Sequence, residues 1–293
     1  MEMVKAKKPM CQPKEKVPWR LQLRWWILRQ QAWFGQTYYG YYGPRTVRTG
    51  PNTIVKFGTS VGQEELEAMR FVSENTTIPI PRVFAGWSIR KAVVIEMEFV
   101  DGTSAWSQWS HLTPPERDAL CSELVGYVHQ LRGLIPPSQT QVTSARGGPV
   151  RDHRLGVYPC GPFDNIDAFH TFLREGNELS SYKEHNPEVV ELHEGTFLSK
   201  FTHGDLHPRN VIIDKHGKIL SIIDWDCAGW RPEYWEYTKS QFVPFGIPEE
   251  WTQALKRATG DYELHHRAER RLWVCNEFPS SGKTFCDPPI AEQ

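Results

Sequence analysis

The chain has 293 residues, of which 39% are hydrophobic and 24% are charged, an ordinary balance for a folded globular protein that is long enough for two lobes. The formal net charge of -1 lacks the basic surplus that binds a phosphate backbone, so we expect no nucleic-acid partner. The six cysteines are widely scattered, which argues against a zinc ribbon or a dense disulfide framework and favours reduced thiols in a cytoplasmic protein. No uncharged apolar run approaches the length of a membrane span, so we expect no membrane partner.

The first predicted elements form a small lobe. Residues 1–18 are basic and proline-rich with little to bury, and we expect them to be disordered. Apolar residues at helical spacing predict a short amphipathic helix over Leu21–Phe34 that packs on the small lobe. A hairpin is predicted for Thr46–Arg48 and Thr53–Phe57 around the turn signal TGPN. The acidic segment GQEELEAMRFVSEN that follows has a partial apolar face and predicts a helix.

The next predicted elements lead into a second lobe. Ala92–Ile95 predicts a buried strand, and the segment EMEFVDG after it predicts the hinge between the lobes. Helical patterns follow over Thr113–Leu131, with Thr113 as the N-cap before two prolines. Residues 136–162 are rich in proline, glycine and serine and long for a loop, so they are either mobile or a substrate-facing insertion. Phe163–Leu173 predicts a further helix.

The most informative stretch is HGDLHPRNVIIDKHGKILSIIDWD, residues 203–226. Two β-branched runs, Val211–Asp214 and Ile219–Ile223, flank a short polar turn that contains a glycine, which predicts a hairpin. Pairing of the two strands brings Asn210 and Asp224 together at the open end, within a residue of register. An amide oxygen and a carboxylate there form an oxygen-only site that suits Mg²⁺ better than zinc.

Asp205 stands five residues before Asn210, in a segment whose glycine and proline indicate a loop. The order Asp, four residues, Asn, hairpin and second Asp is typical of a phosphoryl-transfer centre. In such a centre the first Asp accepts or orients the proton of the substrate hydroxyl, while the Asn and the second Asp hold Mg²⁺ on the nucleotide phosphates. A zinc pair formed by His203 and His207 is disfavoured, because the glycine and proline break the helix that it needs and no Glu lies between them.

The strings FTHGDLHPRN, IIDWD and AGWRPEYWEY resemble the aminoglycoside phosphotransferase and choline kinase group of small-molecule kinases, most closely its fungal branch. The likeness covers roughly residues 50–270, judged by the order of motifs. It implies an α+β, protein-kinase-like fold in two lobes. The N-lobe, a small antiparallel β-sheet that binds nucleotide, spans residues 19–100, and the mainly helical C-lobe, which is catalytic and binds the acceptor, spans 101–275. Residues 276–293 are expected to form a flexible tail.

The resemblance also implies roles for residues outside the central stretch. Lys56 is expected to contact the α- and β-phosphates of ATP and to pair with a helix glutamate. Counting against the family pattern favours Glu65 among three acids that lie close together on that helix. The hinge backbone at Glu98 and Val100 is expected to bind the adenine edge.

These assignments predict an ATP- and Mg²⁺-dependent kinase that phosphorylates a hydroxyl group of a small molecule. Asp205 is the expected base, His203 and Arg209 shape its loop, and Asn210 and Asp224 hold the metal. A protein substrate is disfavoured because DWD replaces DFG and no APE-like activation segment is visible. The acceptor stays open among aminoglycosides, choline-like amino alcohols, sugars and intermediates of fungal secondary metabolism. We expect a monomer.

A catalytically silent nucleotide-binding or scaffold protein on the same fold is the alternative. The reason for this alternative is the segment before Lys56, where Gly40 and Gly43 do not form the GxGxxG loop that covers phosphates in kinases. A hydrolase in which Asp205 activates water is a more distant alternative.

Two further segments have competing interpretations. Trp230–Tyr237 mixes aromatic residues with Glu233 and Glu236, which could hold a cationic substrate, but we favour a structural role. The string SSGKT at Ser280–Thr284 resembles the end of a phosphate-binding P-loop. Position 277 is Glu where that motif needs Gly, and too few residues follow for its helix, so we interpret the string as a tail.

Overall fold

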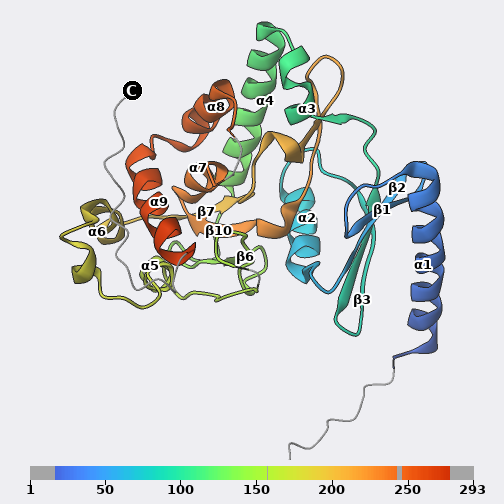
Figure 1. The fold of residues 1–293 in the computed structure, drawn as a ribbon, viewed down its shortest axis with the longest axis horizontal. Coiled ribbons are helices and arrows are strands. Elements are labelled where there is room, and N and C mark those ends of the chain that lie inside the picture. Colours follow the sequence, from blue (N-terminus) through green and yellow to red (C-terminus); the bar gives the residue numbers. More distant parts are fainter. Residues whose placement is uncertain (1–16, 157, 243–245, 278–293) are drawn as a thin grey trace, which may run out of the picture.

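The computed structural model describes residues 17–156, 158–242 and 246–277 of the chain. It has a small lobe built on an antiparallel sheet and a larger, mainly helical lobe (Figure 1). The tails predicted at 1–18 and 276–293 lie almost wholly outside the described residues, and the SSGKT string lies wholly outside them.

The helices are α1 (Trp19–Tyr39), α2 (Gln63–Asn75), α3 (Ala105–Gln108), α4 (Pro114–Gly133), α5 (Ile166–Leu173), α6 (Pro187–Glu194), α7 (Trp235–Ser240), α8 (Glu249–Thr259) and α9 (Glu263–Glu277). The strands are β1 (Thr46–Gly50), β2 (Thr53–Gly58), β3 (Val83–Ile89), β4 (Ala92–Glu98), β5 (Thr103–Ser104), β6 (Thr143–Ser144), β7 (Ser199–Thr202), β8 (Val211–Ile213), β9 (Ile219–Ile222) and β10 (Gly229–Pro232).

The small lobe is a four-stranded antiparallel sheet in the order β1-β2-β4-β3, and the predicted hairpin is its β1-β2 pair. Figure 1 shows the sheet between α1 on one side and α2 on the other. Helix α1 buries Leu28 and Ala32 against valines of the sheet. Helix α2 buries Leu66, Met69 and Val72 on the opposite side, toward the larger lobe. The sheet is therefore covered on both faces, and α2 connects it to the core of the larger lobe.

Helix α1 is longer than the predicted Leu21–Phe34, because it continues to Tyr39 before Gly40 ends it with a positive φ of 85°. Gly35 lets α1 lie close to the sheet, since a Cβ at this position would stand 2.1 Å from the Arg48 carbonyl oxygen. The helix packs on the small lobe as predicted. Its opposite side exposes large apolar side chains, among them Trp19, Leu23, Trp26, Trp33 and Tyr38.

The larger lobe is organised around α4. This helix begins after Thr113, as predicted, and the Thr113 backbone N–H donates to the Glu116 carboxylate at 2.8 Å, as in a capping box. Leu124 and Val128 of α4 lie in the same buried cluster as Trp251 of α8. That cluster also contains the buried face of α2, so one continuous core joins the two lobes. Two short three-stranded sheets, β6-β10-β7 and β5-β8-β9, cross this core and carry the loops described below.

In the described part of the chain, no helix combines the length and apolar character needed to cross a bilayer. Cys121, Cys160 and Cys227 carry free thiols.

Two histidines form a stacked pair in the helical part of the larger lobe. The rings of His170 on α5 and His193 on α6 lie 4.0 Å apart between centroids and 7° from parallel. The Tyr234 hydroxyl lies 2.9 Å from His170 Nε2, and Arg174 contacts His193 Nδ1. Burial lowers the pKa of His170 to about 3, and burial together with the neighbouring His170 and Arg174 lowers the pKa of His193 to about 2. Both rings are therefore neutral at physiological pH.

We predict that this pair makes the fold sensitive to mild acid. The unfolded histidines titrate near pH 6.5, so below that pH the unfolded chain binds protons that the folded chain excludes, and the free energy of unfolding falls as pH falls. The expected loss at pH 5 is about 2 kcal/mol for each histidine. Urea unfolding at pH 7.5 and pH 5 measures it. The matched variant His170→Gln/His193→Gln should lose much less between the two pH values, and an equal loss would contradict the assignment.

Candidate active site

The small lobe contributes an ion pair to the site. Lys56 lies on β2, and its Nζ is 2.7 Å from Oε1 of Glu65 in the first turn of α2. The same ammonium is 2.6 Å from Oδ1 of Asp224, which comes from the larger lobe. Burial opposes the charge on Lys56, but Glu65 and Asp224 outweigh it and raise the pKa of Lys56, so the ammonium stays charged. One lysine thus connects α2, the sheet and the loop after β9.

Of the three neighbouring acids on α2, Glu65 is the one that reaches Lys56. Glu65 is 1% exposed. Burial raises the pKa of its carboxyl group, and the charge of Lys56 opposes that shift. Glu64 instead points to the other lobe, where its Oε2 lies 4.0 Å from Nε of Arg151. Adjacent positions on a helix face different directions, which is why the two glutamates have different partners.

Asp224 lies two residues after the end of β9 and has φ 67° and ψ 62°, the left-handed conformation. Asp tolerates this conformation better than most residues, and such strained backbone is often found at functional sites. The hairpin β8-β9 pairs Val211 with Ile222, and the Ile223 N–H donates to the Asn210 carbonyl at 2.8 Å. Asn210 therefore lies opposite the residue before Asp224, within the predicted single residue of register.

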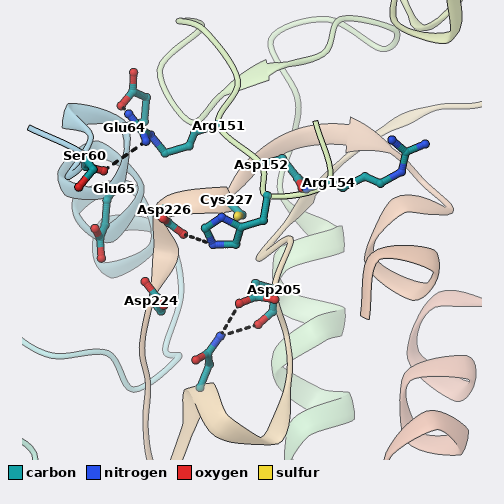
Figure 2. Close-up of polar contacts among 12 residues, drawn as sticks. Ser60, Glu64, Glu65, Arg151, Asp152, Arg154, Asp205, Asp224, Asp226 and Cys227 are labelled. Atoms are coloured by element: carbon teal, nitrogen blue, oxygen red, sulfur yellow. Dashed lines mark hydrogen bonds and ion pairs between the residues drawn. The ribbon is translucent and has the colours of Figure 1, made fainter. Parts of the chain in front are cut away.

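The loop after β7 carries Asp205. Its carboxylate Oδ2 accepts a hydrogen bond from Nδ2 of Asn210 at 2.9 Å, and its backbone carbonyl accepts a second one at 2.8 Å (Figure 2). Since the Asn210 nitrogen makes both bonds, the amide oxygen is the atom of this side chain that can coordinate a cation. Asn210 and Asp224 provide only hard oxygen ligands, a donor set that fits Mg²⁺.

Glu236 holds the start of the Asp205 loop through hydrogen bonds to its backbone. Its carboxylate accepts hydrogen bonds from the backbone N–H groups of His203 at 2.6 Å and Gly204 at 3.1 Å. Gly204 has a φ of 75°, and a Cβ there would stand 2.6 Å from the Cys227 carbonyl oxygen. The His203 ring closes the loop, because Nε2 contacts the Ile223 carbonyl at 3.0 Å and Nδ1 accepts the Asp205 N–H at 3.2 Å. Glu236 is thus committed to the backbone of the loop.

The other residues of the loop are less central. The side chain of Arg209 is exposed, and its backbone N–H donates to Nδ1 of His207 at 3.0 Å. The His207 ring packs 5.3 Å from that of Trp106. Among the described residues, the one group of three or more His, Cys, Asp or Glu side chains with ligand atoms close together consists of His153, Asp226 and Cys227, and it includes neither His203 nor His207.

A cavity of about 580 Å³ opens beside the ion pair, between the sheet and the larger lobe. Glu98 and Val100 of the predicted hinge line it, together with Lys56 and Asp224. The segment Tyr42–Thr46 lines its other end and brings Arg45 into it, although this segment lacks a GxGxxG motif. The size lies within the range of small-molecule sites.

Sequence reasoning did not single out the segment Arg151–Arg154, which crosses between the lobes. Arg151 Nη1 donates to the Ser60 carbonyl at 3.2 Å, just before α2, while Nε2 of His153 lies 3.8 Å from Oδ1 of Asp226 (Figure 2). The segment belongs to the insertion 136–162, which the structure folds with bridges such as that from Val150 to Cys160. Buried Lys239 on α7 was also missed. Its position two residues after the AGWRPEYWEY string was the available signal, since a lysine beside a buried aromatic segment needs a partner.

A second cavity, of about 460 Å³, lies in the larger lobe, and His153 and Arg154 form part of its lining. Its walls are mostly apolar and aromatic, with Phe172, Phe242 and Trp273. Phe242 connects it to the site, because its ring lies 5.5 Å from Nζ of Lys239, which is 3.7 Å from Oδ1 of Asp205.

Comparison with known proteins gives matches at the level of sequence family and of fold. The model of the phosphotransferase enzyme family matches residues 47–273. The serine/threonine-protein kinase 1 of African swine fever virus is 22% identical over 142 residues, 42% of this chain and 48% of that kinase. The chain therefore spans about half the length of this curated relative.

Solved structures of aminoglycoside phosphotransferases share the fold. A thermostable mutant of APH(4)-Ia without ligand has a TM-score of 0.57 at 14% identity, covering 85% of this chain and 93% of that chain. Its ternary complex with ADP and hygromycin B has a TM-score of 0.55 at 15% identity, covering 80% and 83%. ADP-bound APH(2'')-Ib has a TM-score of 0.52 at 13% identity, covering 87% and 91%.

At these identities the solved structures show the fold alone, and it is the α+β, two-lobed, kinase-like fold that the motifs predicted. The family model, in contrast, covers more than half of the sequence and includes the ion pair, the loop of Asp205 and the hairpin. The chain belongs to the phosphotransferase enzyme family.

Proposed function

We propose that this protein is an ATP- and Mg²⁺-dependent phosphotransferase that phosphorylates a hydroxyl group of a small molecule. One observation carries the proposal, and it has two parts. Lys56, held by Glu65 and Asp224, faces the same cavity as the hinge. The loop of Asp205 and Asn210 lies at the open end of the β8-β9 hairpin, the end that also carries Asp224. A nucleotide-binding scaffold needs only the Lys56 ion pair beside the cavity. The combination supports a catalyst.

Each of these residues has a separate role in the proposed reaction. The hinge backbone at Glu98 and Val100 binds the adenine edge, and Lys56 binds the α- and β-phosphates. Asn210 and Asp224 hold Mg²⁺, which neutralises charge on the phosphate oxygens when it is bound. The Asp205 carboxylate accepts a hydrogen bond from the acceptor hydroxyl and aligns its oxygen with the γ-phosphate. The Glu236 carboxylate and the His203 ring keep the Asp205 loop in place.

We further propose that the acceptor binds in the second cavity and is not a polycation. The lining of that cavity holds one carboxylate, Glu175, and one guanidinium, Arg154, which is paired with Glu269 at 3.3 Å. A polycationic aminoglycoside needs several compensating carboxylates. An alcohol with an apolar or aromatic body fits these walls better. The monomeric state, the cytoplasmic location and the fungal setting stay predictions.

The proposal predicts which acceptors are phosphorylated. Transfer of the labelled γ-phosphate of ATP should occur to members of a panel of uncharged aryl alcohols, with hygromycin B as the polycationic comparison. Trp273→Ala should raise the KM for the alcohol while the KM for ATP stays the same, because Trp273 lines the second cavity only. Transfer to hygromycin B and to no aryl alcohol would reject the acceptor class and leave the phosphotransferase assignment intact.

A further inference from the structure

Lys239 is a buried cation between two carboxylates. It lies on α7, where every residue is buried, and its side chain is 2% exposed. Its Nζ is 3.6 Å from Oδ1 of Asp152 and 3.7 Å from Oδ1 of Asp205. An ammonium this deep in a protein requires paired charge, and here the two carboxylates share it.

Asp152 holds one side of this arrangement rigidly. Its side chain is fully buried, and Oδ1 also accepts a hydrogen bond from the Arg154 backbone N–H at 2.8 Å. Its Oδ2 accepts a hydrogen bond from the indole of Trp235 at 3.0 Å. Trp235 and Lys239 belong to the same short helix, so Asp152 fixes the helix and the ammonium together.

Asp205 is the other side of the arrangement, and its two oxygens have separate partners. Oδ2 is hydrogen-bonded to Asn210, and Oδ1 faces Lys239. Two partners on opposite edges define the rotation of the carboxylate about its Cβ–Cγ bond, whereas one partner leaves it free to turn. We propose that Lys239 is a positioning residue that holds the Asp205 carboxylate in its reactive orientation. The inference rests on the proposed function, in which Asp205 aligns the acceptor hydroxyl.

A purely structural role, in which Lys239 only compensates the charge of Asp152, is the competing explanation. The nearly equal distances to the two carboxylates argue against it. Burial would lower the pKa of Lys239, but Asp152, Cys227 and Asp205 in that order, with Asp226, outweigh burial and raise it, so the side chain is an ammonium. Because it is almost fully enclosed, Lys239 acts through Asp205 and does not contact substrate itself.

The test compares Asp152→Asn with Asp152→Asn/Lys239→Met. Removal of Lys239 alone would leave two buried carboxylates without a cation and risks unfolding the protein. In the double variant the buried charge is that of Asp205 alone, -1, the same sum as for Asp152, Lys239 and Asp205 in the wild type. The background variant keeps Lys239 beside Asp205. Its charge sum is 0, so the two variants differ in the Lys239 ammonium, that is, in one positive charge and its contact with Asp205.

The functional readout is hydrolysis of Mg–ATP without an acceptor, in which water replaces the hydroxyl. We expect kcat of the double variant to be at least about tenfold below that of Asp152→Asn, with the KM for ATP unchanged within about twofold. Equal kcat values in two folded variants would reject the positioning role. If Asp205→Asn leaves hydrolysis unchanged, the proposed function fails instead, which separates the two ideas.

A crystal structure of each variant supplies a readout that does not depend on turnover. The contact of 2.9 Å between Asn210 Nδ2 and Asp205 Oδ2 should persist in Asp152→Asn and be lost, with a rotated carboxylate, in the double variant. An unmoved Asp205 in the double variant would overturn the inference, whatever the kinetic result.

Discussion

Replacement of Asp205 by Asn is expected to lower phosphoryl transfer by about 10²–10⁴-fold, the usual contribution of a general base. The amide has nearly the same shape but cannot accept the hydroxyl proton, and the loop stays anchored by Glu236 and His203. Steady-state kinetics with the preferred alcohol measure kcat and the KM for ATP separately. The loss should be in kcat, because Asp205 does not line the nucleotide cavity.

The exposed Asp118 on α4 gives a matched control, since Asp118→Asn makes the same chemical change away from the site. Its kcat should equal that of the wild type. If Asp205→Asn retains more than a tenth of the wild-type kcat, Asp205 is not the base.

Replacement of Glu236 by Ala is expected to lower the free energy of unfolding by about 3 kcal/mol. The change leaves the buried N–H groups of His203 and Gly204 without an acceptor and opens a cavity beneath the Asp205 loop. Burial raises the pKa of Glu236, and the charge of His203 and the backbone hydrogen bonds from His203 and Gly204 counter that shift. Urea denaturation at neutral pH measures the loss.

Glu233, three residues earlier in the same segment, is the comparison. Its Oε1 accepts the Leu198 N–H at 3.2 Å in an exposed setting, so Glu233→Ala should cost less than about 1 kcal/mol. Equal losses for the two variants would show that Glu236 is not a special anchor of the loop.

The sequence predicted the parts of the fold that local patterns encode. The hairpin at residues 211–222 and the N-terminus of α4 both follow from turn glycines, β-branched runs and a capping residue. The approach of Asn210 to Asp224 follows from the hairpin alone, since strand pairing is nearly fixed once the turn is known. These features depend on residues close in sequence.

The parts that the sequence did not reveal depend on contacts between distant residues. Lys239 and Asp152 are 87 positions apart and meet only because the 136–162 insertion folds back beneath the Asp205 loop. The contact of Arg151 with Ser60 likewise needs the two lobes in place. Nothing in the local pattern of a proline- and glycine-rich loop indicates such partners, so the sequence predicts only that the loop is mobile or faces the substrate.

The most direct test of the central claim is thermal stabilisation by Mg–ATP, measured for the wild type, Asp224→Ala and Asp205→Asn. A ligand that binds the folded state raises the apparent stability by mass action. We predict a clear rise in Tm for the wild type and for Asp205→Asn, and none for Asp224→Ala, because Asp224 holds the metal while Asp205 acts on the acceptor. No rise for the wild type at millimolar Mg–ATP would contradict the account and favour a silent scaffold on the same fold.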